Sequence, residues 1–178
     1  MKQDHPSYEE QRDAYLKGEW GNPLTSKPTG GRILSALQLP YFMILPPRGF
    51  AVLTTTGRKT GKRRRKCVRA IRDGDKVYLV SLPGRYSAWF RNIQAHPQVR
   101  LRMRGGTFEG VAREITDLEE YEAGKAIYCG GVNPFDRLTY LAHRTGRPTA
   151  ERIRAMLERW FTVCTPLLIE LSGKHTEM

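Results

Sequence analysis

The chain has 178 residues, of which 39% are hydrophobic and 10% aromatic, and its formal net charge is +12. That length and composition predict one globular domain with a sizeable core and exclude a disordered chain. The charge is uneven, because the stretch from Trp20 to Phe108 holds eighteen Lys or Arg residues against two acidic ones. Such a field predicts a polyanionic partner, and the candidates are nucleic acid, anionic lipid and a cofactor with phosphate or carboxylate groups.

Residues 1–49 are predicted to form an N-terminal helical extension. A short helix over Tyr8 to Lys17, a linker over Gly18 to Gly31 and a second helix over Arg32 to Leu39, which Pro40 ends, follow from spacing and breaker residues. The apolar segment Ile33 to Leu45 is shorter than the roughly 20 residues that span a bilayer, and no signal peptide is recognisable. We therefore expect a cytoplasmic protein, with peripheral contact to an anionic membrane left open as an alternative.

Residues 50–178 are predicted to form the main domain. Its expected strands are Phe50 to Thr56, Arg64 to Arg72, Lys76 to Ser81, Gln98 to Arg104, Thr107 to Ile115 and Cys164 to Leu171. Its expected helices are Ala88 to His96, Thr116 to Tyr128, Phe135 to Thr145 and Thr149 to Phe161. About six mostly antiparallel strands with one inserted helix and further helices at the end describe an α+β domain whose sheet closes into a small barrel.

The stretch from Thr54 to Lys66 is the strongest functional signal. Seven of its thirteen residues are basic and none is acidic. Gly57 and Gly61 bracket its turn, and glycines allow a backbone to present its amide donors to an anion. The turn leads into a strand, whereas a Walker phosphate loop leads into a helix, so the pattern predicts an anion site of another kind.

The sequence has no residue pattern that indicates a metal site or a catalytic nucleophile. The four histidines stand apart, and neither they nor the three cysteines, Cys67, Cys129 and Cys164, have the spacing of a metal site or a disulfide framework. We therefore predict no bound metal. A basic nucleic-acid-binding domain is an alternative from another functional class, because cations and nearby aromatic residues can bind a nucleic acid, although no aromatic residue interrupts the cation run.

Three segments in order resemble a known family. They are Leu53 to Arg64 (LTTTGRKTGKRR), Asp73 to Ser81 (DGDKVYLVS) and Trp89 to Val99 (WFRNIQAHPQV). Together they resemble the deazaflavin (F420)-dependent nitroreductase and quinone reductase family of actinobacteria, within the split β-barrel flavin and deazaflavin oxidoreductases. The resemblance covers about Leu53 to Ile115.

The resemblance implies a split β-barrel that binds coenzyme F420 and transfers a hydride from its reduced ring to a small acceptor, which is a quinone, a nitro compound or an enone. The cofactor's tail, a phosphodiester followed by glutamates, would account for the cations, with Lys59 and Arg64 matching tail and phosphate contacts. Ser81 matches a serine that donates a hydrogen bond to the acceptor. The implied cofactor-binding residues are Gly57, Arg58, Lys59, Thr60, Gly61, Lys62, Arg64, Trp89 and Asn92.

The chain also departs from the family pattern. Arg65, Lys66 and Cys67 replace residues that are usually small and uncharged beside the ring, and the region from Cys129 to Pro148 is longer. An FMN-binding or cofactor-free relative of the same barrel is therefore the alternative within this fold.

Overall fold

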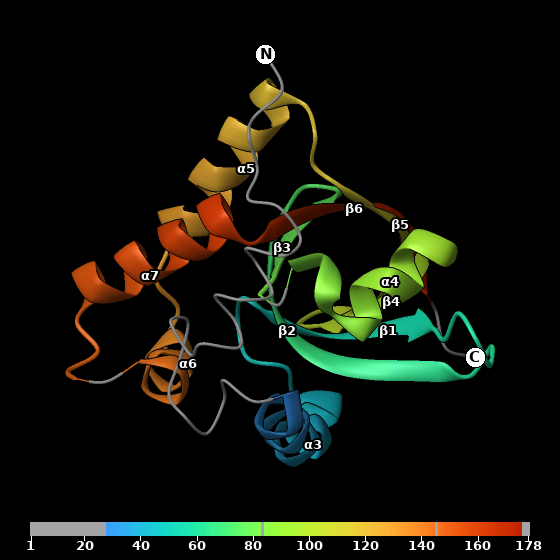
Figure 1. The fold of residues 1–178 in the computed structure, drawn as a ribbon, viewed down its shortest axis with the longest axis horizontal. Coiled ribbons are helices and arrows are strands. Elements are labelled where there is room, and N and C mark those ends of the chain that lie inside the picture. Colours follow the sequence, from blue (N-terminus) through green and yellow to red (C-terminus); the bar gives the residue numbers. More distant parts are fainter. Residues whose placement is uncertain (1–27, 83, 145, 176–178) are drawn as a thin grey trace.

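The computed structural model describes residues 28–82, 84–144 and 146–175. Its centre is a closed antiparallel barrel with the strand order β1-β2-β3-β6-β5-β4 (Figure 1). The strands are β1 (Phe50–Thr56), β2 (Arg63–Asp73), β3 (Lys76–Ser81), β4 (Gln98–Met103), β5 (Gly106–Glu114) and β6 (Thr165–His175). The predicted α+β barrel is confirmed, and the bounds of β1 and β3 are those that the sequence predicted.

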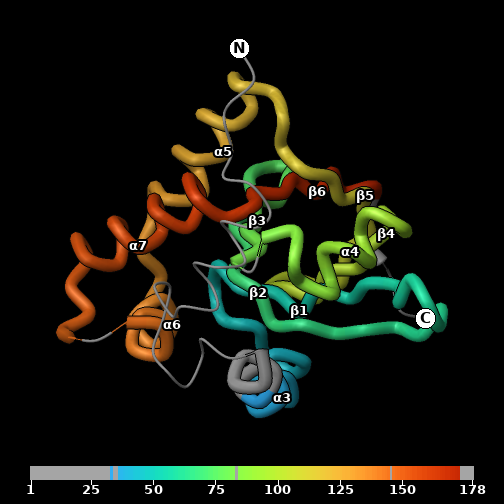
Figure 2. Tube along the Cα trace, viewed as in Figure 1, coloured from blue at the N-terminus to red at the C-terminus, as the bar shows by residue number. Residues whose placement is uncertain are grey.

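Helices surround the barrel on separate sides. They are α3 (Pro28–Ile44), the 3-10 helix η1 (Gly84–Tyr86), α4 (Ala88–Ala95), α5 (Leu118–Gly130), α6 (Asp136–His143) and α7 (Ala150–Val163). Figure 2 shows α5 and α7 beside β3 and β6, whereas α3 lies below the β1–β2 hairpin and α4 lies above it. The β1–β2 hairpin is therefore placed between two helices.

Three apolar clusters follow from the alternation of side chains along the strands. One fills the barrel and includes Leu53, Leu79 and Leu101, which are fully buried. A second lies between the outside of the barrel and α5, α6 and α7, around Trp160. The third is small and joins α3 to β1 through Phe42 and its neighbours. The barrel and the C-terminal helices therefore form one continuous folded body, with α3 attached to it by the smaller third cluster.

The β1–β2 hairpin extends beyond the rest of the barrel. Strand β2 pairs with β3 only over Ala70–Asp73, but it pairs with β1 from Arg63 to Arg69. Strand β1 in turn pairs with β4 only as far as Thr54. The end of the hairpin at Thr56 and Arg63 therefore has no other strand beside it.

The structure corrects the predicted end of the second helix. Helix α3 continues through Pro40 to Ile44. An internal proline costs about 3 kcal/mol, which burial of Phe42 at 0% exposure offsets, and Arg102 Nε donates to the carbonyl of Met43 at 3.2 Å. The end of the predicted linker is also wrong, because Pro28 is the first residue of α3, a position that suits proline.

Other parts of the predicted extension lie outside the described residues, among them the helix over Tyr8 to Lys17. The division of the chain at residue 50 stays a prediction. Within the described ranges, none of the helices has the length and apolar character to span a bilayer.

The start of α5 is also one residue later than predicted. Asp117, not Thr116, caps it, and the Asp117 side chain accepts a hydrogen bond from the backbone N–H of Glu120 at 2.9 Å. The strand-like course persists to Ile115, whose N–H donates to the carbonyl of Pro166 at 3.2 Å. The helix also runs to Gly130, so the predicted loop begins two residues too early.

Candidate functional site

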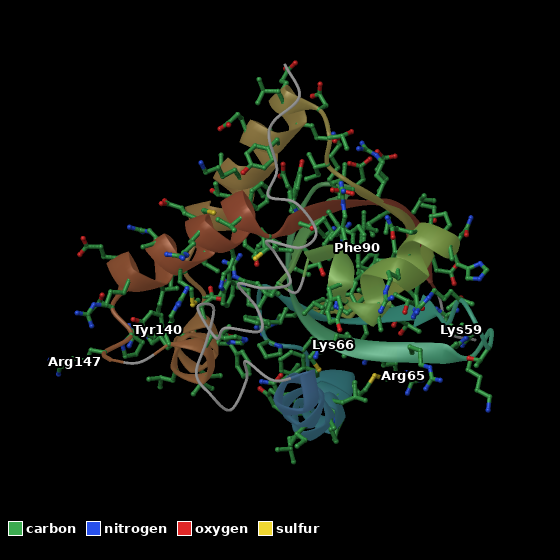
Figure 3. The ribbon with its side chains drawn as sticks, in the orientation of Figure 1. Lys59, Arg65, Lys66, Phe90, Tyr140 and Arg147 are labelled. Atoms are coloured by element: carbon green, nitrogen blue, oxygen red, sulfur yellow. The ribbon has the colours of Figure 1, made fainter. Side chains whose placement is uncertain are left out.

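The turn between β1 and β2 presents a group of cations to solvent. Lys59, Lys62 and Arg64 are exposed, and Arg58 is half-buried. In the described part of the chain, none of these four side chains is paired with a carboxylate. Like charges held close together repel each other, and a bound anion relieves that repulsion. Figure 3 shows Lys59 at the far end of this hairpin.

The backbone amides of the turn have partners inside the turn. The N–H of Gly57 donates to the carbonyl of Lys62 at 2.9 Å, and the N–H groups of Thr60 and Gly61 donate to the carbonyl of Gly57 at 3.1 and 2.7 Å. Gly61 has φ +64°, which closes the turn in this way. The structure therefore differs from the prediction of free amide donors at Gly57 and Gly61, and it leaves the side chains as the anion-binding groups.

The cations of β2 alternate between the two faces of the hairpin. Arg64 lies opposite Thr55, which contacts α4, and its Nε is 3.7 Å from where a Cβ on Gly57 would lie. Arg65 lies opposite Thr54 on the other face. That face is covered by α3 two residues further on, where Cys67 packs in the third cluster. The α4 side therefore holds Arg64. The α3 side holds Arg65, which Figure 3 shows below the hairpin.

Asn92 of α4 connects this helix to the hairpin. Its side chain is 5% exposed. The Oδ1 atom accepts from the backbone N–H of Arg58 at 3.2 Å and from Nη1 of Arg58 at 3.3 Å. The Nδ2 atom donates to Oγ1 of Thr55 at 3.2 Å. The same Nη1 of Arg58 donates to the carbonyl of Ala88 at 3.5 Å, so Arg58 is partly engaged with the protein.

Ser81 lies at the end of β3 and is fully buried. Its hydroxyl is 2.8 Å from the carbonyl of Gly84, to which it donates, and 2.9 Å from the hydroxyl of Ser87. Ser87 in turn caps α4 by accepting from the N–H of Phe90 at 3.1 Å. In this conformation Ser81 therefore supports the start of α4, and its contact with an acceptor stays a prediction.

Trp89 precedes the buried Phe90 on α4 and packs, partly buried, against the barrel cluster. Two residues of this region were missed from the sequence, Thr55 and Ser87. A sequence signal for Thr55 was its place on the same face of the strand as Ala51 and Leu53, and the structure buries it to 2% exposure. Ser87 stands before a helical pattern, as N-cap residues do. Among the described residues, no three His, Cys, Asp or Glu side chains cluster as metal ligands would.

Comparison with known proteins identifies the family. The sequence profile of the family described as F420H(2)-dependent quinone reductase matches residues 41–129, which include the cationic hairpin, β3 and α4. The chain belongs to this family. The resemblance predicted from the three segments is therefore confirmed, and reduced coenzyme F420, the expected cofactor, is the one in the family's name.

Individual relatives agree with this membership. The chain is 29% identical over 100 residues to the F420H(2)-dependent quinone reductases of Mycobacterium tuberculosis strains H37Rv and CDC 1551. The match covers 54% of this chain and 66% of those relatives, so the chain spans just under two thirds of their length. A solved structure of an F420-H2 dependent reductase, FDR-A, is 21% identical with a TM-score of 0.44, over 69% of this chain and 95% of that one.

Proposed function

We propose that the protein is an F420-dependent oxidoreductase that transfers a hydride from reduced coenzyme F420 to a quinone. The observation that carries this proposal is the exposed cationic turn of the β1–β2 hairpin, free of carboxylate partners in the described residues of a chain that belongs to this family. The tail of F420, with a phosphodiester and carboxylates, is an anion whose charge is opposite to that of this turn. The bound cofactor supplies the hydride, and the protein supplies orientation and charge.

The side chains that would hold the tail are those exposed on the hairpin. Lys59 and Lys62 lie in the turn, and Arg64 lies on the face of the hairpin that contacts α4. Arg64 offers a planar pair of donors suited to a phosphate, whereas the lysines act as mobile point charges on carboxylates. The predicted contacts of the cofactor with Arg58, Thr60 and Trp89 belong to this proposal as well, whereas the amides of Gly57 and Gly61 are bonded within the turn.

The acceptor is proposed to be a quinone, with nitro compounds and enones as further substrates of the same two-electron chemistry. A quinone takes the hydride and one proton to become a hydroquinone, so no nucleophile of the protein is required. For Ser81 we propose a role through Ser87 and α4, because its hydroxyl bonds to Gly84 and Ser87 in the buried interior. A direct bond from Ser81 to the acceptor would require these two contacts to break.

Titration of the purified protein with F420, followed by cofactor fluorescence, tests the proposal. We expect saturable binding that weakens with added salt, because the contacts are ionic. Replacing Lys59 and Arg64 together by Ala should weaken binding at least about 100-fold, since charge-assisted hydrogen bonds are worth roughly 1.5–3 kcal/mol each. Arg104→Ala is the control, because it removes a cation beyond Met103 of β4, at the opposite end of β1.

The alternatives give different outcomes in the same preparation. An FMN-binding relative would carry the yellow absorbance of flavin or bind FMN in preference to F420. A nucleic-acid-binding domain would retain DNA or RNA at physiological salt with a steep salt dependence. Absence of saturable F420 binding, or binding that the double variant leaves unchanged, contradicts the proposal.

We propose a second property, peripheral contact of α3 with an anionic membrane surface. The supporting observation is a row of exposed apolar side chains at helical spacing on α3 and just after it, Ile33, Leu37, Tyr41, Ile44 and Leu45, with exposures from 53% to 79%. The sequence from Trp20 to Arg72 contains no acidic residue, so every charged side chain of this stretch is basic. This combination favours the headgroup region of anionic lipid.

Sedimentation with phosphatidylglycerol vesicles and with phosphatidylcholine vesicles tests this second property. We expect binding to the anionic vesicles alone, and loss of that binding in Leu37→Glu and Ile44→Glu. Leu118→Glu is the control, because Leu118 is 50% exposed at the start of α5, far from α3 (Figure 1). Equal binding by all variants rejects the proposal, and concentration-dependent dimerisation that the α3 variants abolish would assign the surface to a second copy of the chain instead.

A further inference from the structure

We infer that Asn92 is a positioning residue that holds the cationic hairpin against α4, and that Thr55 fixes the side-chain amide of Asn92 in the orientation this requires. The inference rests on the proposed function, since it concerns how the same site is prepared for an anionic tail. It differs from the residue match to the family, which predicts that Asn92 contacts the cofactor directly.

The first observation is that the polar atoms of Asn92 are already in use. Oδ1 accepts two hydrogen bonds from Arg58, at 3.2 and 3.3 Å, and Nδ2 donates to Thr55 at 3.2 Å. The side chain is 5% exposed, so solvent or a ligand has little access to it. An amide that makes these three bonds in a buried position gains nothing by turning toward a cofactor, because its present partners would be left unsatisfied.

The second observation fixes the orientation of the amide. Both groups of Arg58 that reach Asn92 are donors, a backbone N–H and a guanidinium nitrogen, so the atom they contact must be the oxygen. The nitrogen then points to Thr55, whose hydroxyl oxygen accepts from it. Thr55 lies in β1 at 2% exposure, so this acceptor is held by the barrel itself. The order of dependence runs from Thr55 to Asn92 to Arg58.

The third observation is that the end of the β1–β2 hairpin has little else to hold it in place. The end of the hairpin has no neighbouring strand, and its exposed cations repel one another. Without a link to α4, the turn would be free to move, and binding a tail would then cost the entropy of ordering it. Because Arg58 is fixed by its backbone N–H as well as its side chain, the link sets the position of the turn at its first cation.

Limited proteolysis of the apo protein tests the link independently of any cofactor. Trypsin cleaves after Lys59 and Lys62 only when the turn opens. We expect Asn92→Ala to be cut there several-fold faster than wild type, with the cut sites assigned by mass spectrometry. Gln94→Ala is the matched control, because Gln94 is exposed on the same helix and has none of these bonds. Equal cleavage rates in both variants overturn the inference.

A double-mutant cycle tests the order of dependence. Asn92→Ala is expected to weaken F420 binding by about 10-fold. Arg58→Ala removes the guanidinium but leaves the backbone N–H of residue 58 bonded to Asn92, so it should weaken binding by a smaller factor in the Asn92→Ala background than in wild type. Thr55→Val should weaken binding by about 3-fold and add nothing in the Asn92→Ala background. Fully additive losses would show that Asn92 and Arg58 contact the cofactor independently, which overturns the inference.

The deazaflavin without its phosphodiester and glutamates separates positioning from general damage. The Asn92→Ala variant should bind this tail-less compound as wild type does, while its affinity for whole F420 falls. A variant that is merely less stable would lose both affinities together, which contradicts the inference. If wild type binds no F420 at all, the proposed function fails, whereas the proteolysis result still decides whether Asn92 holds the hairpin.

Discussion

Strand β2 carries arginines in opposite situations at its start and in its middle. At its start, Arg64 and Arg65 are exposed and have no carboxylate partner within the described residues. Further along, Arg69 is 3% exposed, and its Nε lies 2.9 Å from Oδ1 of Asp136, which is fully buried. Arg69 also donates to the carbonyls of Tyr128 and Gly131 at 2.7 and 2.9 Å.

This difference separates structural from ligand-binding cations. Each side-chain nitrogen of Arg69 donates to the end of α5, to Gly131 or to the start of α6, and Asp136 in addition accepts from the N–H of Asn133 at 2.7 Å, so this pair attaches the α5–α6 connection to the barrel. The exposed arginines have no such task in the fold. Arg69 forms bonds that hold the fold together, whereas the side chains of Arg64 and Arg65 remain available to bind a ligand.

Removal of the buried acid is the change with the largest expected effect. Asp136→Ala leaves the Arg69 guanidinium buried without its counter-ion, and we expect a loss of about 3–5 kcal/mol in the free energy of unfolding. Urea denaturation followed by circular dichroism measures it. Glu109→Ala is the control, because Glu109 also lies 2.9 Å from an arginine, Arg100, but the two side chains are 51% and 28% exposed.

The control variant, Glu109→Ala, should lose at most about 1 kcal/mol of the free energy of unfolding, because exposed ion pairs contribute little. A second comparison sharpens the test. Replacing both members of the buried pair, as Arg69→Met with Asp136→Leu, should cost much less than Asp136→Ala alone, because no charge remains buried. If all three variants lose the same free energy, the pair is not what attaches the connection.

The two exposed arginines give the next largest effect, on binding instead of stability. Arg64 lies on the α4 face of the hairpin and Arg65 on the opposite face. We expect Arg64→Ala to weaken F420 binding by about 10-fold, the loss of one charge-assisted contact, and Arg65→Ala by about 2-fold through the general field. Both variants have the same net charge, so fluorescence titration compares geometry alone. Equal losses would mean that the tail is bound by charge without regard to face.

Local sequence patterns predicted the strands of the barrel and the exposed cations of the hairpin. The turn at Asp73 and Gly74, where Gly74 has φ +59°, and the alternation in β4 placed the barrel strands correctly, since both depend on residues adjacent in the chain. The exposed cations were likewise predicted as a surface for an anion. Local patterns work where neighbours in sequence decide the conformation.

Long-range partners could not be predicted in this way. Arg69 and Asp136 are 67 residues apart, and Asn92 and Thr55 are 37 apart, so no local spacing reveals either contact. Helix α3 continues through Pro40 because Phe42 packs on the barrel, which is again a tertiary effect. The sequence therefore predicted which elements exist and which residues are charged, but not which charges the fold would neutralise.

Removal of the N-cap of α4 should have a smaller effect, and it should lower both the stability and the affinity for F420. Ser87→Ala removes the hydrogen bond to the N–H of Phe90 and should cost about 1 kcal/mol of stability. Because α4 carries Asn92, we expect F420 binding to weaken as well. Thr149→Ala is the control, since Thr149 caps α7 by accepting from the N–H of Arg152 at 3.3 Å. Thr149→Ala should lose similar stability but bind F420 as wild type does. If both variants bind F420 more weakly, the loss of affinity does not depend on α4.

The smallest expected effect concerns the exposed ion pair between Arg113 and Glu120. It shows whether the exposure of an ion pair or its contact distance decides how much the pair contributes to the free energy of unfolding. Arg113 donates two hydrogen bonds of 2.7 Å to Glu120, closer than the buried pair, but its side chain is 46% exposed. These bonds lower the pKa of Glu120 from its ordinary 4.5, so the stabilisation is present above that pH and is lost as the pH falls through the lowered pKa. Glu120→Gln should therefore cost only about 0.5 kcal/mol near neutral pH, and the difference should vanish in acid. Urea denaturation over a pH series measures both, and a cost equal to that of Asp136→Ala would mean that geometry outweighs exposure.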